Sequence, residues 1–178
     1  MKVAVFMGAS TPNDERYMKA AKRFGRLLAK YGHELVFGGS FTGLMGEVAR
    51  GFLDLKGVAH GLEIKKYYDE SLKADYDRCA TFDVVDDLPI RKTMMINMAD
   101  AYVVLPGGVG TLDEAFEVLT IRQMDGLTKP VIFYDMFGFY ENLKKHLKGM
   151  VNKKVYKFGE FDKIIWARNA GDVMDALR

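Results

Sequence analysis

The sequence is poor in several features, and each scarcity narrows what the protein can be. It has one cysteine, Cys79, among 178 residues, so no internal disulfide can form, which suits a reducing cytosol. No apolar run approaches the roughly 20 residues of a membrane-spanning helix. The opening MKVAVFMGAS has one basic residue and too short an apolar run for a signal peptide. We therefore expect a cytoplasmic protein that does not insert into membranes.

The sequence also lacks a strong excess of charge. It has 26 Lys and Arg against 24 Asp and Glu, a formal net charge of +2, so global charge favours neither nucleic acid nor a membrane surface as a partner. The three histidines are scattered, and no His, Cys or acid spacing suggests a metal site. The length favours one domain over residues 1–178.

Short apolar runs alternate with longer segments of helical periodicity. Continuous apolarity within the runs is typical of strands covered on both faces, as in parallel sheets. The alternation predicts a single-domain α/β protein with a Rossmann-like, doubly wound parallel sheet and helices on both faces. Residues 65–80 are expected to form a polar, partly helical loop. The predicted strands are residues 3–7, 34–37, 58–64, 82–85, 101–105, 131–134 and 164–167, and the predicted helices are 14–31, 44–55, 88–98, 112–124, 140–151 and 172–177.

Three of the predicted strand-to-helix turns are rich in glycine or small polar residues: MGASTPN (7–13), FGGSFTGLMGE (37–47) and LPGGVGTLDE (105–114). A turn without bulky side chains lets backbone N–H groups approach a ligand, and a helix N-terminus leaves several N–H groups unpaired. Such turns lie together at the carboxyl edge of a parallel sheet. With hydroxyls from Ser10, Ser40 and Thr111 beside them, they predict a phosphate site. A single turn of this kind would indicate only tight packing.

Neither of two common nucleotide-binding motifs is present. No turn has the Gly-x-x-x-x-Gly-Lys-Ser/Thr spacing of a P-loop, and none is a Gly-x-Gly-x-x-Gly followed by a ribose-binding acid. A P-loop hydrolase and a dinucleotide-dependent enzyme are therefore disfavoured.

Charged residues accompany the third turn. Glu114 falls in the first turns of the helix that follows Thr111, where an acid stabilises the helix or takes part in chemistry beside a bound phosphorylated sugar. Arg91 and Lys92 belong to another predicted helix, where they bind phosphate or simply lie on the surface. Spacing alone does not decide between a structural and a chemical role for Glu114, or between a surface and a phosphate-binding position for Arg91 and Lys92.

The run from Pro106 to Glu114 resembles the Pro-Gly-Gly-x-Gly-Thr-x-x-Glu signature of the LOG ("lonely guy") family, long labelled lysine-decarboxylase-like. The resemblance extends over nearly the whole chain. It includes the VFMGAS turn, Gly38-Gly39-Ser40 with Gly43-Leu44-Met45-Gly46, the Arg91-Lys92 pair, Thr120, Gln123, Lys129-Pro130 and Phe139-Tyr140 with Leu143.

The resemblance implies hydrolysis of the N-glycosidic bond of a nucleoside 5′-monophosphate, AMP or an N6-substituted AMP, to free base and ribose 5-phosphate. It implies Glu114 and Arg91 as the catalytic pair and requires no metal or organic cofactor. It also implies a homodimer, to which the Met-rich helix 88–98 would contribute. The residues that it implies for substrate and phosphate binding are Ser10, Gly39, Ser40, Lys92, Gly107, Gly108, Gly110 and Thr111.

Three segments depart from the family pattern. After the third strand the family usually has Gly-Val-Ile-Pro, whereas this chain has AHGLEIKKYYDES. Ile121 replaces a frequent Trp, and the His that often precedes the Arg-Lys pair is absent from LPIRK. The departures leave the phosphate motif and Glu114 intact and fall on the side expected for the base.

Two other functions are compatible with parts of the pattern. A non-catalytic carrier of a phosphorylated ligand, similar to the molybdenum-cofactor carriers, would need the glycine turns but no catalytic acid. An amino-acid decarboxylase would need a pyridoxal-type cofactor on a lysine, for which the sequence has no recognisable setting.

Overall fold

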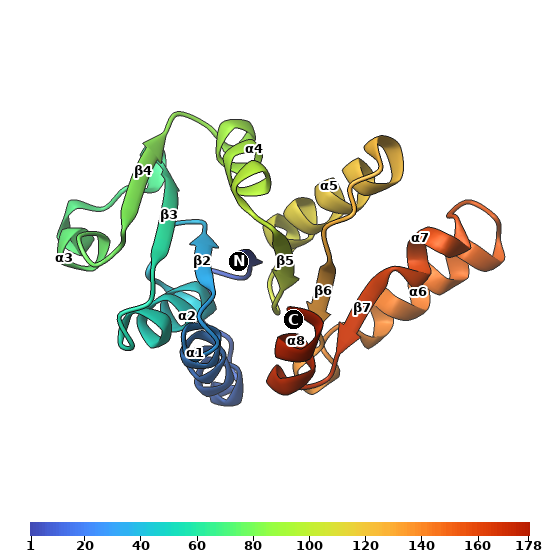
Figure 1. The fold of residues 1–178 in the computed structure, drawn as a ribbon, viewed down its shortest axis with the longest axis horizontal. Coiled ribbons are helices and arrows are strands. Elements are labelled where there is room, and N and C mark those ends of the chain that lie inside the picture. Colours follow the sequence, from blue (N-terminus) through green and yellow to red (C-terminus); the bar gives the residue numbers. More distant parts are fainter.

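The computed structural model describes all 178 residues, and its centre is one sheet of seven parallel strands (Figure 1). The strands are β1 Lys2–Phe6, β2 Glu34–Phe37, β3 Ala59–Ile64, β4 Thr81–Val85, β5 Ala101–Val104, β6 Val131–Tyr134 and β7 Ile164–Ala167. The α-helices are α1 Glu15–Lys30, α2 Gly43–Leu53, α3 Lys73–Tyr76, α4 Leu88–Met98, α5 Val109–Asp125, α6 Glu141–Asn152, α7 Phe158–Asp162 and α8 Ala170–Ala176. The 3₁₀ helices are η1 Lys65–Tyr67, η2 Glu70–Leu72 and η3 Met136–Gly138.

The order of the strands creates one reversal in the middle of the sheet. It is β4-β3-β2-β1-β5-β6-β7, so the chain moves outward from β1 to β4 and then returns to form β5 on the other side of β1. The register pairs Val3 with Ala101 and Phe6 with Val104, so β1 and β5 end at the same level. In an open α/β sheet, a ligand-binding crevice forms at this reversal, beyond the carboxyl ends of the strands.

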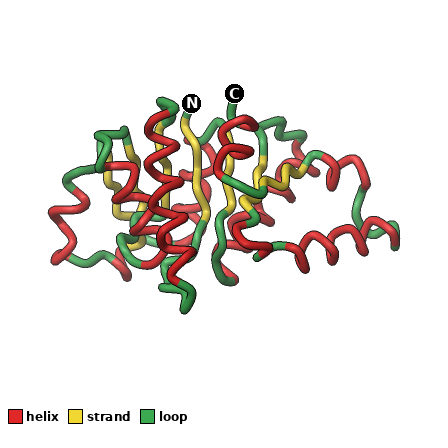
Figure 2. Tube along the Cα trace, turned by 90° about the horizontal axis from the view of Figure 1, so that it is seen from below, coloured by secondary structure: helices red, strands yellow, loops and turns green.

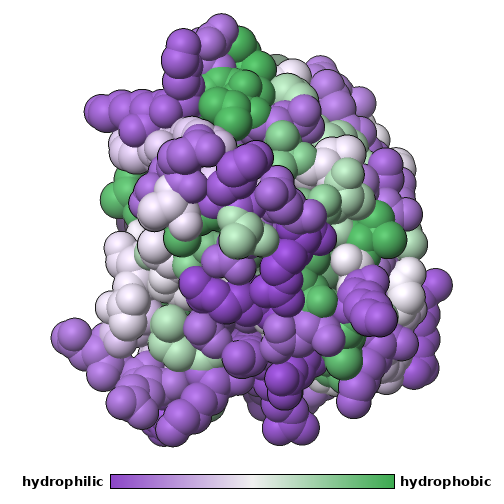
Figure 3. Space-filling model, turned by 90° about the vertical axis from the view of Figure 1, so that its left-hand side faces the viewer, coloured by the Kyte–Doolittle hydropathy of each residue, from purple (hydrophilic) through white to green (hydrophobic).

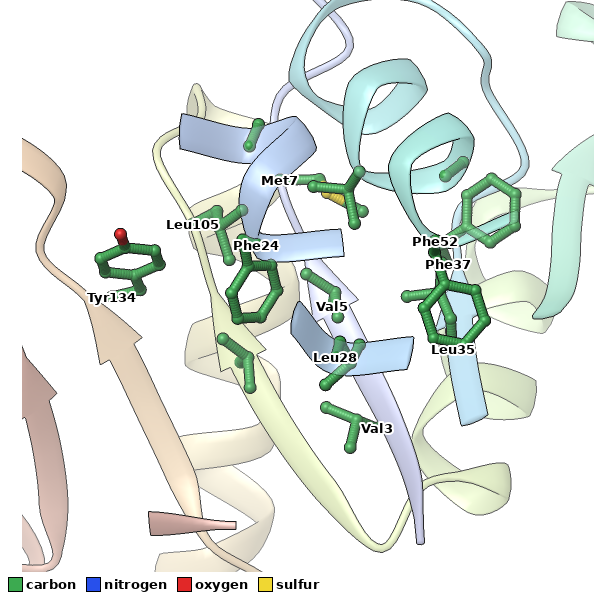
Figure 4. Close-up of a cluster of buried hydrophobic side chains, with 14 of the residues drawn as sticks. Val3, Val5, Met7, Phe24, Leu28, Leu35, Phe37, Phe52, Leu105 and Tyr134 are labelled. Atoms are coloured by element: carbon green, nitrogen blue, oxygen red, sulfur yellow. The ribbon is translucent and has the colours of Figure 1, made fainter. Parts of the chain in front are cut away.

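Helices cover both faces of the sheet (Figures 1 and 2). Alternate residues of β1 serve the two faces: Val3 and Val5 pack with α1, α2 and α8, whereas Ala4 and Phe6 pack with α4, α5 and α6. Figure 4 shows Val3 and Val5 beside Phe24 and Leu28 of α1. Because the strands inside the sheet are buried on both sides, their sequences are mostly apolar, with His60 and Glu63 of β3 as buried exceptions.

The starts of the helices differ in one respect that matters for the site. The Asp14 carboxylate caps α1 by accepting from the Arg16 N–H (2.9 Å), and the Asp87 carboxylate caps α4 by accepting from the Ile90 N–H (2.9 Å). Helix α5 begins after Gly108 without any side-chain cap. Its first N–H groups are therefore left for water or a ligand.

The sheet ends at β4 with an exposed edge strand. Asp83 and Val84 are exposed there, and only Val85 is buried. Figure 3 views the molecule from this side and shows a largely hydrophilic surface with small, separate hydrophobic patches. A charged, short edge strand of this kind discourages pairing with the edge of another sheet.

The doubly wound parallel sheet predicted from the sequence is confirmed, and each predicted strand and helix is present with ends shifted by at most a few residues. Region 65–80 is partly helical as expected, because it forms η1, η2 and α3. The prediction missed α7, whose five residues are too short to show a helical period. None of the helices combines the length and apolarity that crossing a membrane requires.

Helices α1 and α2 approach each other at two glycines. A Cβ on Gly25 would lie 2.1 Å from the Val48 carbonyl oxygen, and one on Gly51 would lie 2.3 Å from the Lys22 carbonyl oxygen. Both obstacles belong to the backbone, so neither can be relieved by a change of rotamer. Glycine at these two positions sets the distance between the helices.

We expect Gly25→Ala to lower the free energy of unfolding by about 1–3 kcal/mol, because overpacking against the backbone exceeds the gain in helix propensity. The matched control is Gly149→Ala in α6, where a Cβ would meet nothing within 4 Å. This substitution should raise stability by about 0.5–1 kcal/mol. Urea unfolding followed by circular dichroism measures both; equal effects of the two would contradict the packing argument.

Candidate active site

The three glycine-rich turns meet at one cavity of about 770 Å³ at the carboxyl edge of the sheet. The Gly8 N–H donates to the Pro106 carbonyl oxygen (3.1 Å), which joins the turn after β1 to the turn after β5. The Thr42 hydroxyl donates to the Ala9 carbonyl oxygen (2.9 Å), which joins the turn after β2 to the first. Ser10, Ser40, Gly107, Gly108, Gly110 and Thr111 all line the cavity.

The uncapped start of α5 forms one end of the cavity. A Cβ on Gly107 would lie 2.1 Å from the Thr111 hydroxyl oxygen, so packing requires glycine there. Gly108 and Gly110 are different, because a Cβ on either would meet no protein atom within 4 Å. Because these glycines have no side chains, the amides of the first turn are open to a ligand. The positive end of the helix dipole is directed toward the same space.

A buried arginine lies between two buried carboxylates. Arg91 comes from α4, Glu114 from the first turns of α5 and Glu63 from the end of β3, and all three line the cavity. The Arg91 Nη2 donates to Glu114 Oε1 at 3.3 Å, and its Nη1 lies 3.7 Å from Glu63 Oε1. The side chains of Glu63 and Glu114 are 4% and 7% exposed, respectively.

Burial dominates the electrostatics of both carboxylates. Loss of water raises the pKa of Glu114 to about 7, and the Arg91 guanidinium opposes that shift. Burial likewise raises the pKa of Glu63, while the Ile64 N–H, which donates to Glu63 Oε1 at 2.8 Å, and the Arg91 charge act against it. Glu114 thus changes its charge near neutral pH, in the range where a carboxyl group can both take up and release a proton.

Two of the residues predicted to bind substrate do not line the cavity. Lys92 forms ion pairs with Asp113 (2.8 Å) and Glu117 (2.7 Å), so it links α4 to α5. The hydrogen bonds that the Lys92 amine donates to these carboxylates raise its pKa. Gly39, at φ +80°, packs its backbone against Glu63, where a Cβ would lie 2.8 Å from the Glu63 Cβ. The structure therefore gives these two residues supporting positions beside the site.

Glu63 was not predicted from the sequence to belong to the site. Its only signal is an acid between Leu62 and Ile64, at the carboxyl end of an otherwise apolar buried strand. Region 65–80, expected only to form a polar, partly helical loop, contributes Tyr67, Asp69, Leu72 and Tyr76 to the cavity wall.

Acidic side chains outnumber basic side chains in the cavity lining. Arg91 is the one basic residue in its lining, against the three acids Glu63, Asp69 and Glu114, and no lysine lines it. No cluster of three or more His, Cys, Asp or Glu side chains has the arrangement of a metal site anywhere in the chain. An anionic ligand must therefore be held mainly by backbone amides and Arg91.

The raised pKa of Glu114 predicts a dependence of stability on pH. Its folded-state pKa of about 7 lies above the ordinary 4.5, so the folded protein binds this proton more tightly than the unfolded chain. The resulting stabilisation is complete below the ordinary pKa and is lost as pH rises through 7. Between pH 4.5 and 8, the wild type should lose about 3 kcal/mol of unfolding free energy relative to Glu114→Gln.

Urea unfolding of both proteins at several pH values measures this difference. Comparing the two proteins at each pH cancels the contributions of all other titrating groups. A constant difference across this range would mean that Glu114 titrates at its ordinary pKa.

Comparisons with known proteins identify the family to which the chain is similar. The family model described as "Possible lysine decarboxylase" matches residues 45–177. A cytokinin riboside 5′-monophosphate phosphoribohydrolase of Mycobacterium tuberculosis is 33% identical over 176 residues, which cover 99% of this chain and 91% of that protein. One from Rhodococcoides fascians is 34% identical over 146 residues, covering 82% and 73%, respectively.

A solved structure extends the likeness at the level of the fold. The molybdenum cofactor binding protein of Rippkaea orientalis superposes with a TM-score of 0.71 over 99% of this chain and 94% of its own, at 19% identity. At that identity the likeness concerns the fold alone. The family match and the two relatives carry more weight, and with them the resemblance seen in the sequence is confirmed: the chain belongs to the LOG family.

Proposed function

We propose that this protein hydrolyses the N-glycosidic bond of a nucleoside 5′-monophosphate, AMP or an N6-substituted AMP, to a free base and ribose 5-phosphate. The observation that carries the proposal is the placement of Glu114. It is a buried carboxyl group with a pKa near 7, in the same helix whose uncapped start offers a phosphate site. The named relatives, which are phosphoribohydrolases, support the same reaction.

The α5 start positions the substrate. The 5′-phosphate would bind to the free amides at Gly108 and Gly110 and to the Thr111 hydroxyl, and the Ser10 and Ser40 hydroxyls would help to hold the nucleotide. This binding energy comes from a part of the substrate remote from the bond that breaks, so it can be used to hold the anomeric carbon beside Glu114.

Hydrolysis then breaks the bond between the anomeric carbon and the base nitrogen. The electron pair of that bond leaves with the base, which takes up a proton, and a water oxygen bonds to the anomeric carbon and loses a proton. The positive charge that develops on the sugar is stabilised by an adjacent carboxylate, and Glu114 can also accept the proton from water. Arg91 keeps Glu114 oriented and favours its ionised form.

We expect Glu114→Gln to lower the rate of base release by about 10²- to 10⁴-fold, because the amide neither accepts the proton nor carries the negative charge. The assay incubates the protein with AMP and with N6-isopentenyl-AMP and quantifies the free base by chromatography. The matched control is Glu117→Gln on the same helix, whose side chain pairs with Lys92 outside the cavity and should leave the rate within a few fold. Undiminished activity in Glu114→Gln would exclude Glu114 as the catalytic acid or base.

The same assay separates this reaction from the two other functions considered above. A carrier would retain a phosphorylated ligand through purification and release no base from any nucleotide. A pyridoxal-dependent decarboxylase needs a lysine in the cavity, and none lines it. The carrier thus remains the alternative that the experiment tests.

We also propose a homodimer formed through α4 and α5. These neighbouring helices, joined by the Lys92 ion pairs, expose Leu88, Ile90, Phe116 and Met124. Apolar side chains gathered on two adjacent helices are typical of an interface between protein chains.

Phe116→Lys should convert the protein to a monomer, because it places a charge among apolar side chains that the dimer would bury. Analytical ultracentrifugation gives the molar mass. Phe158→Lys in α7 is the control, since Phe158 is 65% exposed and lies outside these helices, and it should leave the dimer intact. A wild-type monomer would refute the proposed assembly.

A further inference from the structure

Glu63 is the one buried charged residue of the cavity lining to which the proposed reaction gives no task. It lies at the end of β3, lines the cavity, and has a side chain that is 4% exposed. A carboxylate is costly to bury, so its presence among apolar neighbours requires partners for both oxygens. Within the protein it has partners for only one.

The one hydrogen bond and the one ion pair of the Glu63 side chain both involve Oε1. That atom accepts from the Ile64 N–H at 2.8 Å and lies 3.7 Å from the Arg91 Nη1. Oε2 has no hydrogen-bond partner in the protein, and it is not among the polar atoms that are both fully enclosed and unpaired. It is therefore an acceptor that the cavity itself can reach.

The backbone holds this acceptor in place. Gly39, with φ +80°, packs against the Glu63 Cβ, N and Cα so closely that any side chain at position 39 would collide with them. The Ile64 N–H fixes Oε1 from the other side. A carboxylate held by its own strand and by the neighbouring turn is positioned to recognise a hydrogen-bond donor of a ligand.

The position of Glu63 within the cavity identifies which part of a nucleotide it faces. The phosphate site lies at the start of α5, beyond β5, and the sheet order then runs through β1 and β2 to β3. Glu63 is thus three strands away from the phosphate, roughly 14 Å at about 4.8 Å per strand. Arg91 lies between Glu114 and Glu63, so a nucleotide with its phosphate at α5 and its sugar beside Glu114 would extend its base toward Glu63.

The wall around Glu63 suits a flat, weakly polar group. Tyr67, Leu72, Tyr76 and Met45 line the same cavity as Glu63, and an aromatic or apolar wall can pack against the face of a base. A carboxylate in such a setting accepts hydrogen bonds and cannot donate one while it is ionised.

We propose that Glu63 determines the choice of base, by accepting through Oε2 a hydrogen bond from the exocyclic amino group of an aminopurine. This inference rests on the proposed function, because it takes the ligand to be a nucleoside 5′-monophosphate. A base without an N–H at this position leaves Oε2 unpaired and buried, so it is rejected. The choice of substrate is thus assigned to β3, separately from the catalysis at α5.

The test compares AMP with purine riboside 5′-monophosphate, which lacks only the amino group. The wild type should hydrolyse AMP with a kcat/KM about 10- to 100-fold higher. Glu63→Gln should lose most of that preference, because its AMP rate falls while its rate on the purine analogue changes little. Glu63→Leu, which cannot hydrogen-bond at all, should show the same loss of preference. Asp77→Asn, at an exposed carboxylate paired with Lys73, is the control and should retain the preference.

The outcomes distinguish the role of Glu63 from a structural role and from failure of the proposed reaction. If Glu63 only holds Arg91, its variants lower activity on both nucleotides in the same proportion, and the proposal is overturned. A wild type that prefers the purine analogue also overturns it. Isothermal titration of Glu114→Gln, in which turnover is suppressed, with and without a Glu63 substitution, tests the same preference as a ratio of affinities for the two nucleotides. A preference that depends on Glu63 in binding, with no base released by the wild type, would support Glu63 and refute the hydrolase.

Discussion

The free amides at the start of α5 are the feature on which the rest of the site depends. Most helix starts in this chain are either capped by a side chain or lie away from the cavity, whereas α5 begins at Gly108, at the reversal of the sheet, with no cap. Residues 108–110 are exposed, so these amides are accessible to water or to an anion. Because the cavity contains no lysine, a phosphate bound there would rely on them and on Arg91.

Arg91 organises the remainder of the cavity. It is the only cation facing Glu63 and Glu114, and each of its terminal nitrogens approaches one of them. Removing it would leave two buried carboxylates without a counter-charge, a larger loss than that of any single contact. Each carboxylate meets Arg91 through its Oε1. The second oxygens make no hydrogen bond within the protein, and in the proposed complex one would lie beside the sugar and the other beside the base.

The fold and half of the site could be predicted from the sequence, for identifiable reasons. Buried parallel strands are largely apolar, and glycine turns that follow such strands must lie at one edge of the sheet, so the sequence pattern predicted the cavity. The pattern together with the family resemblance predicted Glu114. Glu63 could not be predicted, because a single acid at the end of a strand forms neither a periodic pattern nor a motif. Its significance comes from contacts with Arg91 and Gly39, which are 28 and 24 residues away in sequence.

Lys92 is the opposite case, a residue that was predicted from the sequence to bind substrate but does not line the cavity. Its position next to Arg91 suggested a shared role, yet adjacent residues of a helix point about 100° apart, so only one of them can face the cavity. Lys92 instead faces Asp113 and Glu117 on α5. These ion pairs connect the helix that carries Arg91 to the helix that carries Glu114.

The charge balance of the cavity explains why the arginine is placed against Glu114 and not against the phosphate alone. A bound phosphate brings negative charge close to a carboxyl group whose pKa is already raised to about 7 by burial. That charge would raise the pKa further and leave Glu114 protonated, unable to accept a proton from water or stabilise a cationic sugar. The Arg91 guanidinium, 3.3 Å from Glu114 Oε1, acts in the opposite direction. It thereby keeps the carboxylate form accessible in the presence of the anion that the α5 amides attract.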